Sequence, residues 1–290
     1  MKFLSLVILA LAVSGNVFAC SEDGKSGIVE ENTLNIPVGV KRNGGITEQQ
    51  FNAVISKIET IYVPIAKSMG GNLKIARKWS DGTVNANATR LFGTWAVNMY
   101  GGLARHETIT EDGFALVLCH EIGHQMGGAP KVGNLLMKWA SNEGQSDYWA
   151  TAKCLRRVFM NDNNAAVLKK LKAKIPATLA NACAKAHGDK IDQDICIRSG
   201  MAGDSVSALF ASIRKQPRAS FDTPDRSKVS KTNDAHPAFQ CRLDTYFMGA
   251  ICEVAFNEDV DQKDEVRGTC HKANGHEIGL RPTCWFKPSK

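Results

Sequence analysis

The feature that most constrains this chain is the segment His120-Glu121-Ile122-Gly123-His124, in which two histidines stand four residues apart. On an α-helix, residues at this spacing share one face, so both imidazoles can bind one metal ion. Such a pair suits zinc, and a glutamate between the ligands can take a proton from water and return it to a leaving group. The segment therefore predicts a helix that carries a hydrolytic zinc site.

The residues on either side predict where this helix begins and ends. Thr110 is a typical N-cap residue, and Glu111 and Asp112 place acids in the first turn, where the helix dipole favours them. Gly127 and Pro130 are typical of a helix end. We therefore expect the two histidines in the second half of one helix.

The letters His-Glu-Ile-Gly occur a second time, at residues 276–279. Position 280 is leucine, so no second histidine follows at the helical spacing. We expect no metal at this second copy.

A third ligand must come from elsewhere, because a catalytic zinc ion usually has three protein ligands. In metzincins a further histidine follows the motif, but here Pro130 stands where that histidine belongs. Residues 142–149 instead offer Glu143 and Asp147, which share a helix face. Glu143 would complete the ligand set and leave a position for water, while Asp147 would orient a ligand imidazole. The alternative is that both are solvated helix acids.

The N-terminus predicts an exported protein. Residues 1–19 have one lysine, an apolar run at 3–13 and a final small residue, Ala19, at the expected cleavage site, as in a secretory signal peptide. Cleavage after Ala19 would leave Cys20 first, either lipidated and attaching the chain to a membrane, or simply the first residue of a secreted protein. Residues 20–27 are polar and suit a tether. The expected location is a bacterial periplasm or envelope, or outside the cell.

The cysteines fit an oxidising compartment. The chain has nine, and setting Cys20 aside leaves an even number suited to disulfides. Cys270 and Cys284 bracket a loop that contains Gly and Pro and are candidates to close it, while the sequence leaves the pairing of the cysteines open. Cys119, next to the first histidine, is expected to be a small buried apolar residue, with a redox role as the alternative.

The net charge of +7 includes a cluster of lysines at 169–174. The cluster favours a solvated helix face over a surface for anionic partners, because no aromatic or glycine-rich nucleic-acid motif accompanies it. We therefore expect no nucleic-acid partner. Nothing in the sequence sets the oligomeric state.

The remaining patterns predict an α+β fold in which a small sheet packs on helices. Thr47 and Gln50 form a capping box for a core helix that is kinked or broken near Pro64. We expect a hairpin of strands 73–79 and 83–88, and a further strand at 94–100 that can pair with an extended peptide. Further helices are expected at 142–159, at 165–185 with an interruption at Pro176, and at 204–215 and 243–254, with a surface loop at 216–237. One domain, 28–256, is followed by a Cys-containing tail, 257–290.

Parts of the chain resemble a known family. Residues 84–160 are similar to the CAAX prenyl proteases and heat-shock membrane proteases, which are HExxH zinc metallopeptidases of gluzincin type. The shared features are a strand that contains Asn-Ala, a Gly-Gly segment, and a helix that begins with acidic residues and leads into HExxH. Residues 142–147 resemble the NExxSD helix of thermolysin-like gluzincins. His236-Pro237 and Arg242 match the family's HPxxxxR element. The chain departs from the family in its shorter spacing between HExxH and the glutamate, and in lacking multiple transmembrane segments.

The resemblance implies a zincin-like fold with one zinc ion on His120, His124 and Glu143. It makes Glu121 the general base and places His236 near the substrate carbonyl, where it would stabilise the oxyanion. Arg242, like Asp147, would act behind these residues. For His236 the alternatives are that it is a loop histidine that caps a helix, and that a tyrosine, Tyr100, Tyr148 or Tyr246, stabilises the oxyanion instead.

We therefore predict an exported zinc-dependent endopeptidase that acts on peptide or protein substrates. The alternative is a noncatalytic, zinc-stabilised envelope binding protein or chaperone-like module. Structural zinc sites usually have four protein ligands, whereas this set offers three and a base, which favours the enzyme.

Overall fold

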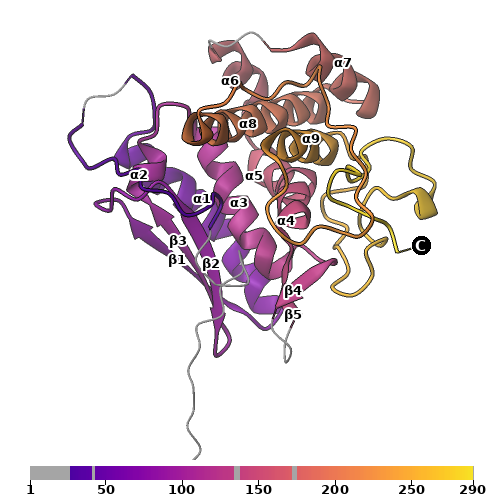
Figure 1. Cartoon of the computed structure of the whole chain (residues 1–290), viewed down its shortest axis with the longest axis horizontal. Helices are drawn as coiled ribbons and strands as arrows, with labels where there is room; N and C mark the ends of the chain where they lie inside the picture. The colour runs from indigo at the N-terminus through magenta and orange to yellow at the C-terminus, as the bar shows by residue number, and fades with distance from the viewer. Residues whose placement is uncertain (1–26, 41–42, 134–137, 172–174, 290) are drawn as a thin grey trace, which may run out of the picture.

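The computed structural model describes residues 27–40, 43–133, 138–171 and 175–289. It has an α+β fold with a three-stranded sheet at one side, a small two-stranded sheet, several helices and a C-terminal segment that is mostly loop (Figure 1). The predicted signal peptide, most of the predicted tether and Cys20 lie outside the described residues. Within these residues, no helix has the length and apolar character that crossing a membrane requires.

The sheet consists of β1 (Asn72–Lys78), β2 (Ala86–Leu91) and β3 (Thr94–Tyr100), in the order β1-β3-β2. β1 runs parallel to β3, and β2 runs antiparallel to it. The predicted hairpin of 73–79 with 83–88 is therefore wrong. The hairpin instead joins β2 to β3 through Phe92 and Gly93, both with positive φ, and the turn residues 80–82 only end β1.

β3 is the central strand of this sheet, and its side chains alternate between buried and half-buried. Its buried side chains belong to the main hydrophobic core and share one face of the strand, as the two-residue period requires, and the strand contacts α3 (Glu111–Met126). Both of its edges are hydrogen-bonded to neighbouring strands, so the prediction that residues 95–100 pair with an extended peptide is wrong. The outer strand next to α3 is β2.

Two helices pack on the sheet (Figure 1). α1 (Glu48–Ser68) begins with the predicted capping box and continues through Pro64. α3 (Glu111–Met126) begins after Thr110, whose side chain accepts a hydrogen bond from the Gly113 amide, so the predicted start is confirmed. Every α3 residue from Gly113 onward is buried, because the sheet lies on one side of the helix and α8 on the other.

The second half of the chain is mostly helical. The predicted helix at 142–159 is present as α4, a π-helical turn and α5, and residues 165–185 form two helices on either side of Pro176, in agreement with the predicted interruption. Residues 204–215, in contrast, are the end of a longer helix. That longer helix starts early because Asp189 caps it by accepting from the Asp192 amide. Residues 216–237 form the expected loop without helix or strand. The other elements are α2 (Gly101–Ala104), β4 (Lys131–Gly133), β5 (Lys138–Ser141), α4 (Glu143–Trp149), η1 (Ala150–Cys154), α5 (Leu155–Phe159), α6 (Asn164–Lys170), α7 (Ala177–Ala186), α8 (Lys190–Arg214), α9 (Phe239–Ala250) and η2 (Lys272–Asn274).

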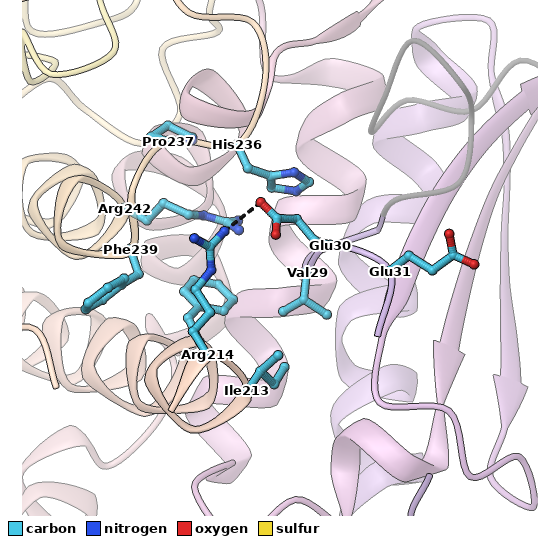
Figure 2. A pocket seen from close by; sticks show the side chains of 10 residues that line it. Val29, Glu30, Glu31, Ile213, Arg214, His236, Pro237, Phe239 and Arg242 are labelled. Carbon is cyan, nitrogen blue, oxygen red and sulfur yellow. Dashed lines mark hydrogen bonds and ion pairs between the residues drawn. The ribbon is translucent and has the colours of Figure 1, made fainter. Parts of the chain in front are cut away.

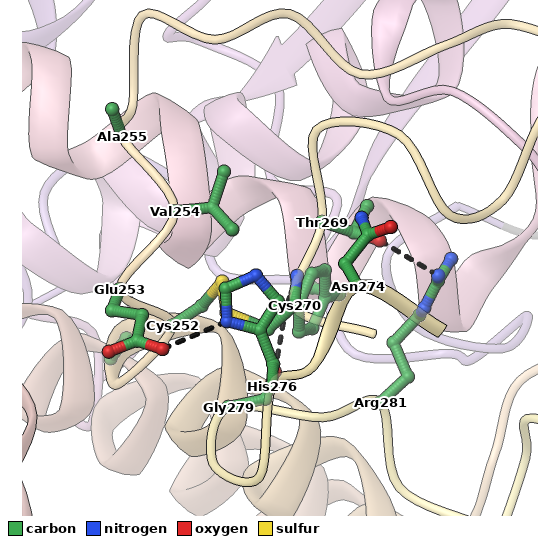
Figure 3. Close-up of a disulfide and its surroundings, with 12 residues drawn as sticks. Cys252, Glu253, Val254, Ala255, Thr269, Cys270, Asn274, His276, Gly279 and Arg281 are labelled. Carbon is green, nitrogen blue, oxygen red and sulfur yellow. Dashed lines mark hydrogen bonds and ion pairs between the residues drawn. A yellow bond between two sulfur atoms is a disulfide. The ribbon is translucent and has the colours of Figure 1, made fainter. Parts of the chain in front are cut away.

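All eight cysteines after Cys20 form disulfides: Cys119–Cys154, Cys183–Cys196, Cys241–Cys284 and Cys252–Cys270. The candidate pairing of Cys270 with Cys284 is wrong, because each bonds to a cysteine at or just after α9. Cys119 is buried as expected but is bonded to η1 rather than packed as a free thiol. The bridges tie the C-terminal segment to the helical core (Figure 3).

Candidate metal centre

His120 and His124 lie one turn apart on α3, with ring centroids 4.7 Å apart and no exposed surface. The Nδ1 atom of each ring has an oxygen partner. His120 Nδ1 lies 2.7 Å from Asp147 Oδ1, and His124 Nδ1 lies 2.8 Å from the Ser141 carbonyl oxygen. Partners at Nδ1 fix the ring orientation and direct both Nε2 atoms toward the same space, as in histidine metal ligands.

Glu143 reaches this space from the first turn of α4. The helix starts there because Asn142 caps it, with its side-chain oxygen accepting from the Gln145 amide at 2.9 Å. Glu143 Oε2 lies 3.2 Å from His120 Nε2, and Oε1 lies 3.7 Å from His124 Nε2. Ligand atoms about 2.1 Å from one ion at tetrahedral angles lie about 3.4 Å apart, so these spacings suit a single ion.

The group His120, His124 and Glu143 therefore meets the geometry of a metal site, with one ligand atom from each residue within 4.8 Å of the others. The surrounding atoms support this assignment. Both carboxylate oxygens of Glu121 are fully buried and have no hydrogen-bond partner among the described residues. Unpaired buried carboxylate oxygens are costly, and a bound cation with its water would satisfy them. The residues present thus fit a metal ion.

A second cluster with ligand-type side chains contains Asp225, Cys241 and Cys284. Its two cysteines are bonded to each other, so they cannot supply thiolates. Within the described residues the α3–α4 cluster is therefore the one with ligands available for a metal.

Burial gives the titratable groups of the centre unusual pKa values. For Glu121, burial and the nearby Glu143 raise the pKa to about 8, although His120 opposes the shift. For His120, burial alone would lower the pKa, but Asp147 and Glu143 outweigh it and raise the pKa to about 9. For His124, burial lowers the pKa to about 4, which favours the neutral imidazole that a metal requires. Perturbed groups of this kind cluster at functional sites.

Asp147 and Arg242 form a buried chain behind His120, as predicted. Arg242 donates from Nε to Asp147 Oδ2 at 2.8 Å and from Nη2 to Oδ1 at 2.9 Å, a bidentate pair. Although burial of Asp147 would raise its pKa, Arg242 and His120 outweigh that effect and lower it. The carboxylate therefore stays charged and holds the His120 ring in place.

His236 also reaches the centre from the loop before α9. Its Nε2 lies 3.1 Å from Glu143 Oε2 and 2.9 Å from the carbonyl oxygen of Gly27. The alternative, a histidine that caps α9, is wrong because Ala238 is the N-cap residue and no side chain caps the helix. Tyr148, one of the alternative oxyanion donors, donates instead to the Gly279 carbonyl oxygen, on the side of the C-terminal segment.

Two residues of the C-terminal segment, Arg281 and Trp285, contact α4, although the sequence analysis did not single them out. Arg281 donates to Gln145 Oε1 at 2.9 Å, and Gln145 donates to the Gly127 carbonyl at the end of α3. The Trp285 ring covers Gly144, where a Cβ atom would lie 2.2 Å from the ring. Figure 3 shows Arg281 beside Thr269, to which it also donates. No local pattern marks Arg281 and Trp285, because their partners on α4, Gln145 and Gly144, lie more than a hundred positions away.

A comparison of the chain with protein-family models found no match. Neither curated proteins nor solved structures gave a match. The geometry of the site and the resemblance of its motifs to HExxH metallopeptidases are therefore the features that point to a function.

Proposed function

We propose that this protein is a zinc-dependent endopeptidase with a zincin-like fold. The observation that carries the proposal is the buried cluster of two imidazoles and one carboxylate, with Glu121 next to it and without a hydrogen-bond partner in the part of the chain that the structure describes. Two nitrogen ligands and one oxygen ligand are typical of catalytic zinc in peptidases. A bound zinc ion would polarise a peptide carbonyl and make a water molecule more acidic.

Glu121 serves as the proton carrier in this proposal. Its carboxylate accepts a proton from the attacking water and passes it to the amine that leaves when the peptide bond breaks. Its position one residue after His120 on α3 keeps it beside the ligands. Its burial excludes bulk water, which would otherwise compete for that proton.

His236 is the proposed donor to the oxyanion. Its Nε2 already lies at hydrogen-bond distance from a peptide carbonyl oxygen, that of Gly27, and in contact with the ligand Glu143. A donor placed in this way can stabilise negative charge that develops on a substrate carbonyl. Through their ion pair, Arg242 and Asp147 position His120.

We further propose that the protein acts outside the cytoplasm, in the periplasm, at the envelope or as a secreted enzyme. Four disulfides support this location, because such bonds persist in oxidising compartments. Attachment to a membrane through lipidated Cys20 remains part of the proposal.

One observation favours a second function. His120, His124 and Glu121 have no exposed surface, and Glu143 is nearly as buried, as in closed structural sites. In that case zinc would stabilise a noncatalytic binding protein of the envelope. Substitution of Glu121 separates the two functions, since an enzyme loses turnover while a binding protein keeps its function.

Removal and replacement of the metal test the peptidase proposal. We expect the zinc-loaded protein to cleave an unstructured substrate such as casein, to lose this activity after dialysis against a chelator, and to regain it with zinc but not with magnesium. Cleavage that survives complete removal of the metal would refute the proposal, as would a broad peptide library left intact both by the zinc-loaded wild type and by a zinc-loaded variant in which residues 27–30 are displaced.

A further inference from the structure

The first described residues of the chain cross the metal centre. Ile28 and Val29 lie between the start of β2 and α9, and the Ile28 amide donates to the Ala86 carbonyl oxygen at 2.9 Å. Ile28 has no exposed surface, and Val29 has 5 %. Figure 2 shows Val29 and Glu30 facing Arg214, His236 and Arg242 across a pocket. This short segment, residues 27–30, is called the N-terminal strap below.

The centre holds the strap by its backbone. The Gly27 carbonyl oxygen lies 2.9 Å from His236 Nε2, and the Ile28 carbonyl accepts from Arg242 Nη1 at 2.6 Å. The same two side chains contact the metal-binding carboxylate Glu143, at 3.1 Å and 4.0 Å. Two successive peptide carbonyls are therefore fixed by groups that also contact a proposed zinc ligand.

Asn85 holds the strap from the opposite side. Its side-chain oxygen accepts from the Val29 amide at 3.3 Å, and its side-chain nitrogen donates to the Val29 carbonyl at 3.1 Å. A side-chain amide that pairs with both backbone groups of one residue imitates a neighbouring strand. Contacts of this kind are independent of side-chain identity, as in grooves that bind peptides by strand addition.

The space around residues 27 and 28 of the strap accepts only certain side chains. A Cβ atom on Gly27 would lie 1.8 Å from the Ala86 carbonyl oxygen and 2.5 Å from Asn85 Oδ1, so glycine fits there without displacement of the backbone. The next side chain, that of Ile28, belongs to the main hydrophobic core. The pattern along the strap is thus a glycine followed by a buried aliphatic residue.

We propose that the N-terminal strap occupies the peptide-binding groove of the metal centre as a built-in substrate mimic. A peptide substrate takes the same path once the strap leaves, with glycine at the Gly27 position and an aliphatic side chain at the Ile28 position. Its carbonyls bind His236 and Arg242, and its backbone pairs with Asn85 and Ala86. This proposal rests on the proposed peptidase function and adds to it a substrate preference and an autoinhibitory contact.

At the other end of the strap, Glu30 forms an ion pair with Arg214 at 2.6 Å. Both side chains are largely exposed, so this pair contributes little to holding the strap. Release therefore depends mainly on the contacts of Gly27, Ile28 and Val29. Substitutions at the first two of these residues are the appropriate probes.

The test measures peptide binding rather than cleavage, so its failure is distinct from failure of the peptidase proposal. All proteins carry Glu121→Gln, are loaded with zinc and retain the full chain. Gly27→Val displaces the strap through its clash with Ala86, and Ile28→Asp expels it by burying a charge. The matched control is Gly188→Val, because a Cβ atom on Gly188 meets open space. The probe is a fluorescently labelled peptide of residues 26–31, SGIVEE, followed by anisotropy.

We expect Gly27→Val and Ile28→Asp to bind the probe at least tenfold more tightly than the Gly188→Val control. A probe with aspartate in place of isoleucine should not bind. Hydrogen exchange at the Ile28 amide reports whether the strap has left in Gly27→Val. Equal probe affinity in all three proteins would overturn the proposal. Loss of folding in both strap variants would also overturn it, by showing that the strap is an indispensable part of the core.

Discussion

The tetrapeptide His-Glu-Ile-Gly occurs twice in this chain, and the two copies have different surroundings. Residues 120–123 belong to α3, where His120 and Glu121 are completely buried. Residues 276–279 follow η2 in a loop, where His276 pairs with the largely exposed Glu253 at 2.9 Å (Figure 3). Identical side chains thus lie in a candidate metal centre in one region and in a surface ion pair in the other.

The difference shows what a short motif requires from its fold. On α3 the helix places His124 one turn after His120, and α4 brings Glu143 and Asp147 against the same face. In the C-terminal loop, position 280 is leucine and Gly279 adopts a positive φ, which ends any helical path. Substitutions at or near the first copy and matched substitutions at or near the second copy should therefore differ in their effects.

The largest difference is expected between the two glutamates. Glu121→Gln should retain zinc and fold but lower peptidase turnover by about 10³–10⁴-fold, because the proton carrier is lost. Glu277→Gln alters an exposed side chain and should leave turnover unchanged. Initial rates on one peptide substrate compare the two, and equal turnover would remove Glu121 from the mechanism.

A smaller loss of turnover is expected when the histidine proposed to bind the oxyanion is replaced. His236→Ala should lower turnover by about 10²–10³-fold with little effect on zinc binding, since one donor is removed. His276→Ala is the control and should retain full activity. Steady-state kinetics together with zinc content decide this, and wild-type turnover in His236→Ala would contradict the role.

The carboxylates that face the two histidines differ as well. Asp147→Asn should weaken zinc binding by about 10–100-fold, because Asp147 orients the His120 ring from behind. Glu253→Gln, which alters the partner of His276, should not change zinc affinity. Competition with a chromogenic chelator measures both affinities, and an unchanged value for Asp147→Asn would show that His120 needs no such partner.

For the glycines of the two copies we expect the opposite order, with the larger loss of stability in the C-terminal copy. Gly279→Ala places a side chain at φ +68° with its Cβ atom 2.6 Å from Cys252 Cα, so we expect a loss of about 1–3 kcal/mol. Gly123→Ala puts its Cβ atom 3.2 Å from Ser146, and the gain in helix propensity of up to about 1 kcal/mol offsets this tight contact. Urea denaturation should rank Gly279→Ala as the less stable, and the opposite ranking would contradict the described loop conformation.

The local parts of the site were predictable from the sequence. Thr110, the four-residue spacing of His120 and His124, and the pairing of Glu143 with Asp147 on one helix all depend on neighbours within one or two turns. The structure brings His120, His124 and Glu143 together, with Asp147 beside His120, as the sequence predicted. The pairing of Arg242 with Asp147 was not part of that prediction.

The non-local parts were not predictable. The parallel pairing of β1 with β3 and the partners of Cys270 and Cys284 depend on contacts between distant segments, and the cysteine pattern allows many pairings. Gly27 and Ile28 carry no motif, and their contacts with His236 and Arg242 span most of the chain. Such features depend on the whole fold rather than on any single segment.

Zinc titration of Glu143→Ala tests the central claim, that His120, His124 and Glu143 together hold one metal ion. The matched control is Glu277→Ala, which removes the same side chain next to the second histidine copy. We predict one zinc ion per chain in the wild type and the control, and an affinity in Glu143→Ala that falls by more than the 10–100-fold typical of an outer partner. Equal zinc affinity in all three proteins would contradict the account.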